Sequence, residues 1–308
     1  AGETGQCNKS IVCPYHGWTY ALDGANRGIA RKETFPNMDR DRLGLLPLNM
    51  EIWNGFIFVK FKESPQPSVN EIMARFDHEI VDYCLEEMIP VPESQWSEII
   101  DVNWKSVRDV DNEGYHVKQA HPGLEDLYGQ NYNDEPFQNG TSRSVGVFNT
   151  KPSKRWSVQN YLKLIPKVDK LSKKNKNRWL YAGMFPNLVF GFYPESVIYY
   201  MEIPISATQT VQRGGTLRYP DETRGLKLAR YLSGRIDRDT AKEDQMLAVW
   251  SCEATKSSAY SGIILSDLEY GVKTYHDHLR KIMPVLALQD PPVEGQTTSV
   301  NSKMINSS

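Results

Sequence analysis

Residues 103–124 read NWKSVRDVDNEGYHVKQAHPGL, and this stretch decides how the larger part of the chain is interpreted. It contains two histidines, His116 and His121, five positions apart. We predict a helix over Asp109–His121, in which a slight distortion after His116 lets both imidazoles face one point. Glu113 lies one turn before His116 on the same face. Two neutral imidazoles and one carboxylate are the ligands of a mononuclear non-haem iron(II), and they leave positions open for O₂ and substrate.

A second candidate metal-binding string lies near the start of the chain. Residues 13–20 read CPYHGWTY, in which Cys13 and His16 are separated by two residues and could bind one iron from a tight loop. A pair of this kind taken alone is more often a coincidence than a ligand site. Aromatic side chains within the string, such as Tyr15 and Trp18, would shield an iron–sulfur cluster from water. The longer string therefore favours a cluster site over chance.

These strings resemble one known family. CPYHGWTY, followed by a turn at Asp23-Gly24 and by the run Trp53–Val59, is similar to the Rieske domain of ring-hydroxylating oxygenase alpha subunits. In such domains a [2Fe–2S] cluster has two thiolate ligands on one iron and two imidazole ligands on the other. The resemblance implies that Cys13 and His16 are half of this ligand set. It places the other half, a C-x-H pair, before Ala1, so we expect the chain as given to be truncated at its N-terminus.

The catalytic domain of the same family implies the remaining site residues. N-W-K, followed by E-x-Y-H and then H-P, at residues 103–122 resembles that domain. The family's third iron ligand comes from a downstream Glu-Asp pair, which implies Asp244 as the ligand. Glu243 is its local competitor and is expected to be a solvated helix residue. Glu113 is implied to be the inter-site electron bridge, which links the mononuclear iron to a Rieske histidine of a neighbouring subunit.

One departure from the family pattern lies beside this site. Asp109 is followed by Val110 and Asp111, where the family usually has Asn and an aromatic residue. We expect this change to alter contacts around the iron ligands. It keeps an inactive homologue among the possible interpretations.

The resemblance implies the terminal component of an oxygenase. Its [2Fe–2S] cluster would receive electrons from a ferredoxin or a flavin reductase and pass them to the mononuclear Fe(II), which binds O₂ beside a small organic substrate. The chain has neither a G-x-G-x-x-G dinucleotide motif nor plant-type ferredoxin cysteines, so the electron donor is expected to be a separate protein. A homotrimer is also implied. A simple electron carrier is disfavoured, because it would not use the second metal site.

The resemblance defines the expected reaction more closely than the expected substrate. We expect hydroxylation or dihydroxylation of an organic substrate, with an aromatic compound as the first choice. The alternatives are a monooxygenase or N-demethylase of a choline-, betaine- or carnitine-type quaternary amine, and an inactive homologue. Six aromatic residues are candidate pocket walls, although each could equally belong to the core: Tyr128, Tyr132, Phe137, Phe148, Phe190 and Phe192.

Hydrophobic periodicity and the resemblance together predict an α+β fold. Residues 1–62 are expected to form a small all-β, partial Rieske domain, and residues 63–68 a linker. Residues 63–285 are expected to form the catalytic helix-grip domain, an antiparallel sheet with helices packed on it. Residues 286–308 are polar and are predicted to be a disordered tail. The elements predicted in the catalytic domain are helices at Val69–Glu87, Thr223–Cys252 and Ser266–Ile282 and strands at Trp96–Trp104, Leu188–Tyr193, Val197–Ile203 and Thr208–Leu217.

Bulk composition excludes some partners. A net charge of −2 in 308 residues indicates no nucleic-acid or membrane-surface partner. No stretch approaches the roughly 18 consecutive apolar residues of a membrane span. Only four cysteines occur, which argues against a disulfide framework and for a reducing, cytoplasmic compartment.

Overall fold

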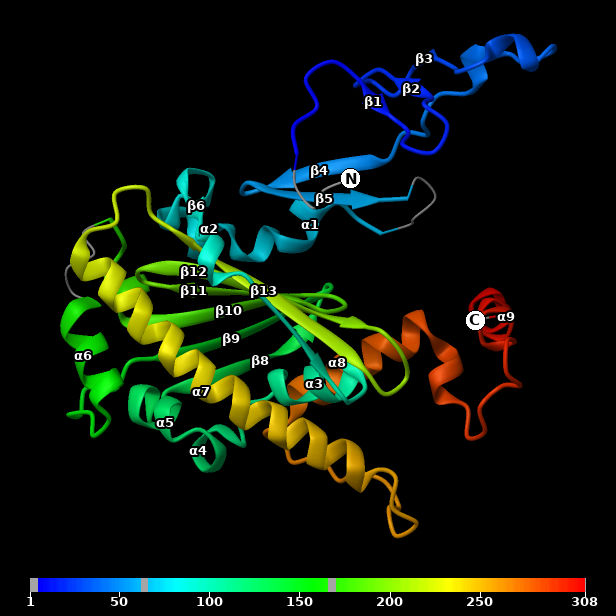
Figure 1. The fold of residues 1–308 in the computed structure, drawn as a ribbon. Coiled ribbons are helices and arrows are strands. Elements are labelled where there is room, and N and C mark those ends of the chain that lie inside the picture. The colour runs from blue at the N-terminus through cyan, green and yellow to red at the C-terminus, as the bar shows by residue number, and fades with distance from the viewer. Residues whose placement is uncertain (1–4, 62–65, 166–169, 308) are drawn as a thin grey trace. The chain divides into compact units, whose positions relative to one another are not determined.

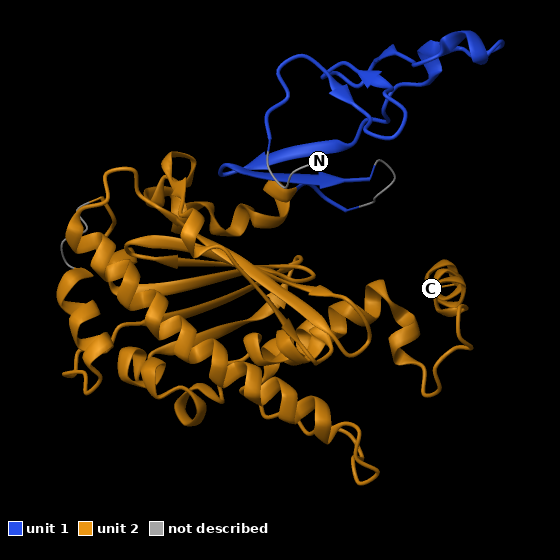
Figure 2. Cartoon of the chain, viewed as in Figure 1, with its two compact units in different colours: residues 1–68 blue, residues 69–308 orange. Residues whose placement is uncertain are grey.

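The computed structural model describes residues 5–61, 66–165 and 170–307. The chain forms two compact units, residues 1–68 and residues 69–308 (Figure 2). The boundary therefore lies between residues 68 and 69, whereas the sequence predicts it between residues 62 and 63. Residues 63–65 of the predicted linker lie outside the described residues.

Unit 1 contains two small antiparallel sheets. One has three strands, β1 (Ile11–Val12), β2 (Thr19–Tyr20) and β3 (Asn26–Gly28), and the other is the hairpin β4 (Asn49–Trp53) and β5 (Phe56–Lys60). The hairpin turn is Asn54-Gly55, in which both residues have positive φ, as the tightest hairpin turns require. Two single-turn 3₁₀ helices, η1 (Lys32–Thr34) and η2 (Arg40–Arg42), follow β3 and precede β4 along the chain. The described part of this unit thus has the predicted strands, and its identity as a Rieske domain stays a prediction.

Unit 2 is built on one antiparallel sheet of eight strands (Figure 1). Seven strands follow the order β6-β13-β12-β11-β10-β9-β8, and β7 also pairs with β13. The strands are β6 (Ile89–Pro90), β7 (Trp96–Ile100), β8 (Tyr132–Gln138), β9 (Thr141–Val147), β10 (Arg178–Met184), β11 (Leu188–Tyr193), β12 (Ser196–Pro204) and β13 (Thr210–Arg218). The three predicted strands after Phe185 are confirmed as β11, β12 and β13.

A long helix, α7 (Arg224–Ala254), crosses one face of this sheet, as Figure 1 shows. It buries Ala229, Leu232 and Ile236, whose spacing of three and four residues puts them on one helical face. They pack with Leu127 and Trp179 in the main core cluster. The helices that contact α7 are α3 (Trp104–Asp111), α5 (Pro122–Tyr128) and α6 (Trp156–Leu164). The predicted helix at Thr223–Cys252 is confirmed, and the last one begins later than predicted, as α8 (Tyr270–Ile282).

Two predictions about the ends of unit 2 are wrong. The segment Val69–Glu87 is a series of short turns and not one helix: α1 (Val69–Met73), η3 (Ala74–Phe76), α2 (Asp77–Ile80), η4 (Val81–Tyr83) and η5 (Leu85–Glu87). Cys84, in a left-handed conformation, interrupts the path between η4 and η5. The tail predicted to be disordered over residues 286–308 contains helix α9 (Thr297–Ser307). Its Asn301 side chain accepts a hydrogen bond from the backbone N–H of Val285 at 3.2 Å, in the 3₁₀ helix η9 (Pro284–Ala287). The amino-acid composition of the segment does not indicate this contact between α9 and η9.

No helix in the described ranges is both long and apolar enough to cross a membrane.

Candidate metal centre

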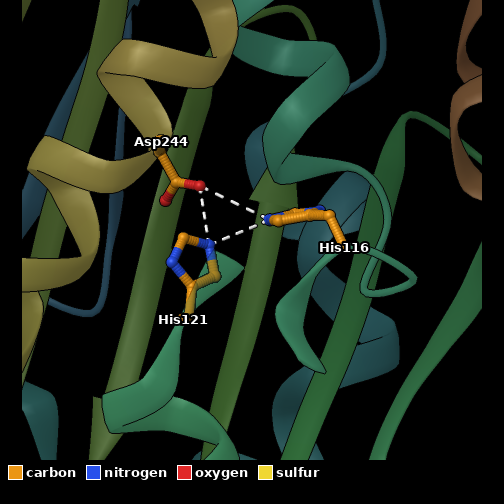
Figure 3. Close-up of side chains that lie close together, drawn as sticks. All are labelled: His116, His121 and Asp244. Carbon is orange, nitrogen blue, oxygen red and sulfur yellow. Dashed lines mark hydrogen bonds and ion pairs between the residues drawn. The ribbon is translucent and has the colours of Figure 1, made fainter. Parts of the chain in front are cut away.

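Three side chains of unit 2 converge on one point (Figure 3). One potential ligand atom each of His116, His121 and Asp244 lies within 4.8 Å of the other two. The two imidazole Nε2 atoms are 2.9 Å apart. Asp244 Oδ1 lies 2.8 Å from Nε2 of His121 and 3.4 Å from Nε2 of His116. The structure therefore brings together the three residues proposed as iron ligands from the sequence.

A break in the chain direction places the two histidines. The prediction of one distorted helix over Asp109–His121 is wrong, because α3 ends at Asp111 and a separate helix, α4 (Val117–Ala120), follows. His116 and His121 are the residues that flank α4 on its two sides. Gly114 lies in the break, where a Cβ would stand 2.1 Å from the Tyr132 ring, so only glycine fits. The Glu113 carboxylate accepts a hydrogen bond from the backbone N–H of His116 at 3.2 Å and stabilises the new turn.

Carboxylates on the far side of each imidazole set its orientation. Nδ1 of His116 is hydrogen-bonded to the Glu113 carboxylate, and Nδ1 of His121 lies 2.9 Å from Oε2 of Glu243. When both rings are neutral, as metal binding requires, these acceptors hold the proton of each ring at Nδ1, and the lone pairs of both Nε2 atoms then point at one another and at Asp244 Oδ1. Three electron-pair donors facing a common centre repel one another unless a cation lies between them. The donor set, two imidazoles and one carboxylate, fits iron(II) or a similar divalent ion.

The prediction that Glu243 is a solvated helix residue is wrong. Its side chain is about one third exposed and contacts the ring of His121. The two acids of α7 contact different nitrogens of His121. Asp244 lies beside Nε2, where the three side chains converge, and Glu243 lies beside Nδ1 on the other side of the ring. Only the contact itself reveals this role, because the two acids are adjacent and chemically alike.

The electrostatics of the cluster are those of paired charges. Burial disfavours the charged form of His116, but hydrogen bonds to Asp244 and Glu113 outweigh it and raise the pKa to about 10. Burial also acts to raise the pKa of Asp244, but hydrogen bonds with the two histidines hold it below its ordinary value. Protons and a metal ion would compete for the same nitrogen lone pairs.

The three residues line a cavity of about 770 Å³ on the sheet side of α7. Of the six aromatic residues predicted as possible pocket walls, Tyr132 lines it, and the others are buried core side chains. Aromatic lining that was not predicted from the sequence comes from four tyrosines of strands β10 to β12 and from one residue each of β7 and α7: Tyr181, Tyr193, Tyr199, Tyr200, Trp96 and Tyr231. The volume suits a small organic ligand.

Asp111, at the departure from the family pattern, belongs to a hydrogen-bond network around Arg108. The buried Arg108 donates to Asp111 at 3.0 Å and to the Asn112 side-chain oxygen at 3.2 Å. It also lies 3.5 Å from the carboxylate of Glu202 on β12. The residues next to the break are therefore tied to the sheet by a guanidinium.

Replacing Glu243 with glutamine is expected to weaken metal binding about 10–100-fold, because the amide no longer provides a charged acceptor to hold the proton of His121 at Nδ1. Titration of the metal-free protein with iron(II) under nitrogen measures the effect. An unchanged affinity would mean that this carboxylate does not orient the ring.

The second candidate metal-binding string, with Cys13 and His16, lies in the β1–β2 loop of unit 1. The loop is closed by hydrogen bonds from the Cys13 N–H to the Trp18 carbonyl (2.8 Å) and from the Gly17 N–H to the Cys13 carbonyl (2.9 Å). Cys13 is partly buried and His16 is exposed. In the described part of the chain these two have no third metal-binding partner beside them. Tyr15, expected to shield a cluster, is 83% exposed.

Curated relatives are oxygenase subunits. The chain is similar to the glycine betaine monooxygenase oxygenase subunit of Pseudomonas aeruginosa, with 34% identity over 122 residues that cover 40% of this chain and 27% of that protein. It is also similar to the chloroplastic choline monooxygenase of Spinacia oleracea, with 24% identity over 245 residues that cover 73% and 55% of the two chains. The chain thus spans well under two thirds of the length of these relatives.

Solved structures agree in fold. A quaternary ammonium Rieske monooxygenase has a TM-score of 0.70 at 21% identity, over 89% of this chain and 72% of that one. Naphthalene 1,2-dioxygenase from Rhodococcus sp. has a TM-score of 0.62 at 14% identity, over 88% and 75% of the two chains. The sequence model of the ring-hydroxylating alpha subunit, catalytic domain, matches residues 77–285. The chain accordingly belongs to the ring-hydroxylating alpha subunit family of Rieske oxygenases, and unit 2 carries its catalytic domain.

Proposed function

We propose that this chain is the catalytic part of a terminal oxygenase that oxidises a small organic substrate with O₂. The convergence of His116, His121 and Asp244 beside a cavity carries the proposal. These three residues would hold a mononuclear iron, which when bound supplies the O₂ chemistry that amino-acid side chains lack. Electrons would come from a separate ferredoxin or flavin reductase.

Each residue of the site has a separate task in this proposal. Glu113 and Glu243 hold the two imidazoles in one tautomer, so that the metal-binding nitrogens face inward. The tyrosines of the cavity wall exclude water and position the substrate. Cys13 and His16 would provide half of the ligands of a [2Fe–2S] cluster. Glu113 would also serve as the electron bridge to the cluster of a neighbouring subunit in a trimer.

For the substrate class, a quaternary ammonium compound has the better support. Relatives of this chain are monooxygenases of glycine betaine, carnitine and choline. The aromatic substrate expected first from the sequence rests on the family's general chemistry and on a neighbour at 14% identity, which supports the fold alone. Monooxygenation is accordingly favoured over dihydroxylation.

Oxygen uptake tests the proposal. The full-length protein, reconstituted with iron(II) and a reductase, is expected to consume O₂ when choline, glycine betaine or carnitine is added. A His121→Ala variant should lose this response, because a ligand of the metal is missing. Benzoate serves as the aromatic comparison and distinguishes the two substrate classes. A reduced, iron-loaded protein that shows no substrate-dependent uptake with any of these compounds would contradict the proposal.

A further inference from the structure

An acidic residue, Asp237, lines the same cavity at a distance from the metal ligands. It lies on α7 seven residues before Asp244, and seven residues are close to two helical turns. The two acids therefore lie on one face of the helix, about 10 Å apart along its axis. A small substrate between them could place one end near Asp237 and a reactive carbon near the metal ligands.

A chain of tyrosines holds the Asp237 carboxylate in place. Its Oδ1 accepts a hydrogen bond from the Tyr193 hydroxyl at 2.9 Å. That hydroxyl lies 3.3 Å from the hydroxyl of Tyr181, which in turn lies 3.3 Å from that of Tyr128. The Tyr193 ring is stacked on Trp179 at 3.9 Å between centroids, which fixes its direction. Asp237 is thus linked through the Tyr193 hydroxyl to a row of tyrosines whose positions are set by the sheet and its core.

The carboxylate makes no ion pair with any residue that the structure describes. Of the other acids that line the cavity, Asp111 is paired with Arg108 and Glu113 with His116, whereas Glu93 and Glu98 are exposed to solvent. Desolvation, with a smaller effect of the nearby Glu195 charge, raises the pKa of Asp237 to about 8, although the Tyr193 hydrogen bond acts in the opposite direction. The ionised form of Asp237 is thus disfavoured in the empty cavity, where it makes no ion pair. A bound cation would favour the ionised form by supplying its counter-charge.

The basic residues of α7 at this cavity do not fill the role. Arg230 is paired with Glu222 at 2.6 Å. Arg238, the next residue along the helix from Asp237, is exposed to solvent, and its charge lowers the pKa of Asp237 less than desolvation raises it. Lys227 and Lys242 also line the cavity and are exposed to solvent. The combination of one carboxylate without an ion pair and a cavity wall rich in tyrosine is the chemistry that recognises an alkylated ammonium group, which has no N–H to donate and binds through charge and aromatic contact.

We propose that Asp237 determines substrate specificity by providing the counter-charge for a quaternary ammonium head, with Tyr181 and Tyr193 as the aromatic walls around it. This inference rests on the proposed function, because it assigns the substrate class to a residue of the same cavity. It makes Asp237 a binding group and leaves metal binding to His116, His121 and Asp244.

The test compares choline with its uncharged isostere, 3,3-dimethylbutan-1-ol, which has the same shape and hydroxyl group. Both are titrated calorimetrically, without O₂ or reductant, into the full-length, iron-loaded protein. The wild-type protein is expected to bind choline at least about tenfold more tightly than the isostere. Asp237→Asn keeps an acceptor for Tyr193 but removes the charge, and should abolish this preference by weakening choline binding alone. Asp239→Asn, an exposed acid two residues along α7, is the matched control and should bind both compounds like the wild type.

A second variant separates charge from packing. Tyr193→Phe keeps the ring on Trp179 but removes the hydroxyl that stabilises the ionised carboxylate, and should weaken choline binding several-fold with little effect on the isostere. A choline preference that persists in Asp237→Asn overturns the inference, and so does a wild-type protein with no preference. Iron content and O₂ uptake are measured on the same samples. If both are normal while the preference is absent, the inference fails and the oxygenase proposal stands; if the wild type does not retain iron, the oxygenase proposal itself fails.

Discussion

Replacing Asp244 with alanine is expected to lower iron(II) affinity by more than about 100-fold, beyond the loss typical of an outer-sphere partner. The change leaves two imidazole nitrogens 2.9 Å apart with no anionic ligand. Two neutral donors bind a divalent ion more weakly than a set that includes a carboxylate, and they no longer define three positions of one coordination sphere. Oxygen uptake should be lost together with the metal.

Metal analysis after dialysis measures the Asp244→Ala effect. The wild-type protein should retain about one iron per chain at this site, counted separately from any iron–sulfur cluster by chelation of iron(II) under non-denaturing conditions. Asp239→Ala is the control on the same helix, because that acid is exposed and lies outside the cluster. The ligand assignment is wrong if Asp244→Ala keeps wild-type iron content and turnover. Glu243→Gln should fall between the two, since it removes only an orienting contact.

The ligand residues could be predicted from the sequence because they lie in recognisable strings. His116 and His121 stand in E-x-Y-H and H-P contexts, and Asp244 follows a glutamate in a downstream pair. The path of the chain between the two histidines could not be predicted. It depends on Gly114, whose missing side chain lets the ring of Tyr132 on strand β8 approach. That contact is tertiary and leaves no periodic signal.

The residues that line the cavity were the hardest part of the site to predict, because many of them lie on strands of the sheet. Strands β11 and β12 are rich in β-branched and aromatic residues and could be predicted, but β8, β9 and β10 are not among the predicted strands, and of these β8 and β9 carry polar residues. Thr141 and Ser144 on β9 are buried, and Ser144 lines the cavity, so polarity there marks an internal wall and not a surface loop. Which face of each strand points into a cavity depends on register across the sheet, which no local pattern reveals.

The largest stability effect is expected at Glu79, which lies outside the metal centre. Its carboxylate, almost fully buried, accepts hydrogen bonds from Arg143 at 2.7 and 3.0 Å and from Arg178 at 2.7 Å. Burial acts to raise the pKa of Glu79, but the hydrogen bonds and charges of the two arginines outweigh it and hold the pKa well below its usual range. Glu79 therefore joins α2 to strands β9 and β10, two of the strands whose residues line the cavity.

Glu79→Gln should lower the free energy of unfolding by about 3–5 kcal/mol, because it leaves buried guanidinium groups without their counter-charge. Urea unfolding measures it, with the exposed Glu86→Gln as the control, which should change stability by less than about 0.5 kcal/mol. The pH dependence provides a second check. A carboxylate whose pKa is lower in the folded state stabilises fully above its unfolded pKa of about 4.3, and the contribution is lost as the pH falls toward the folded value. The difference between wild type and Glu79→Gln should thus be constant from neutral pH down to about pH 5 and shrink below it. A difference that grows on acidification would show that the Glu79 carboxylate is not the stabilising partner of Arg143 and Arg178.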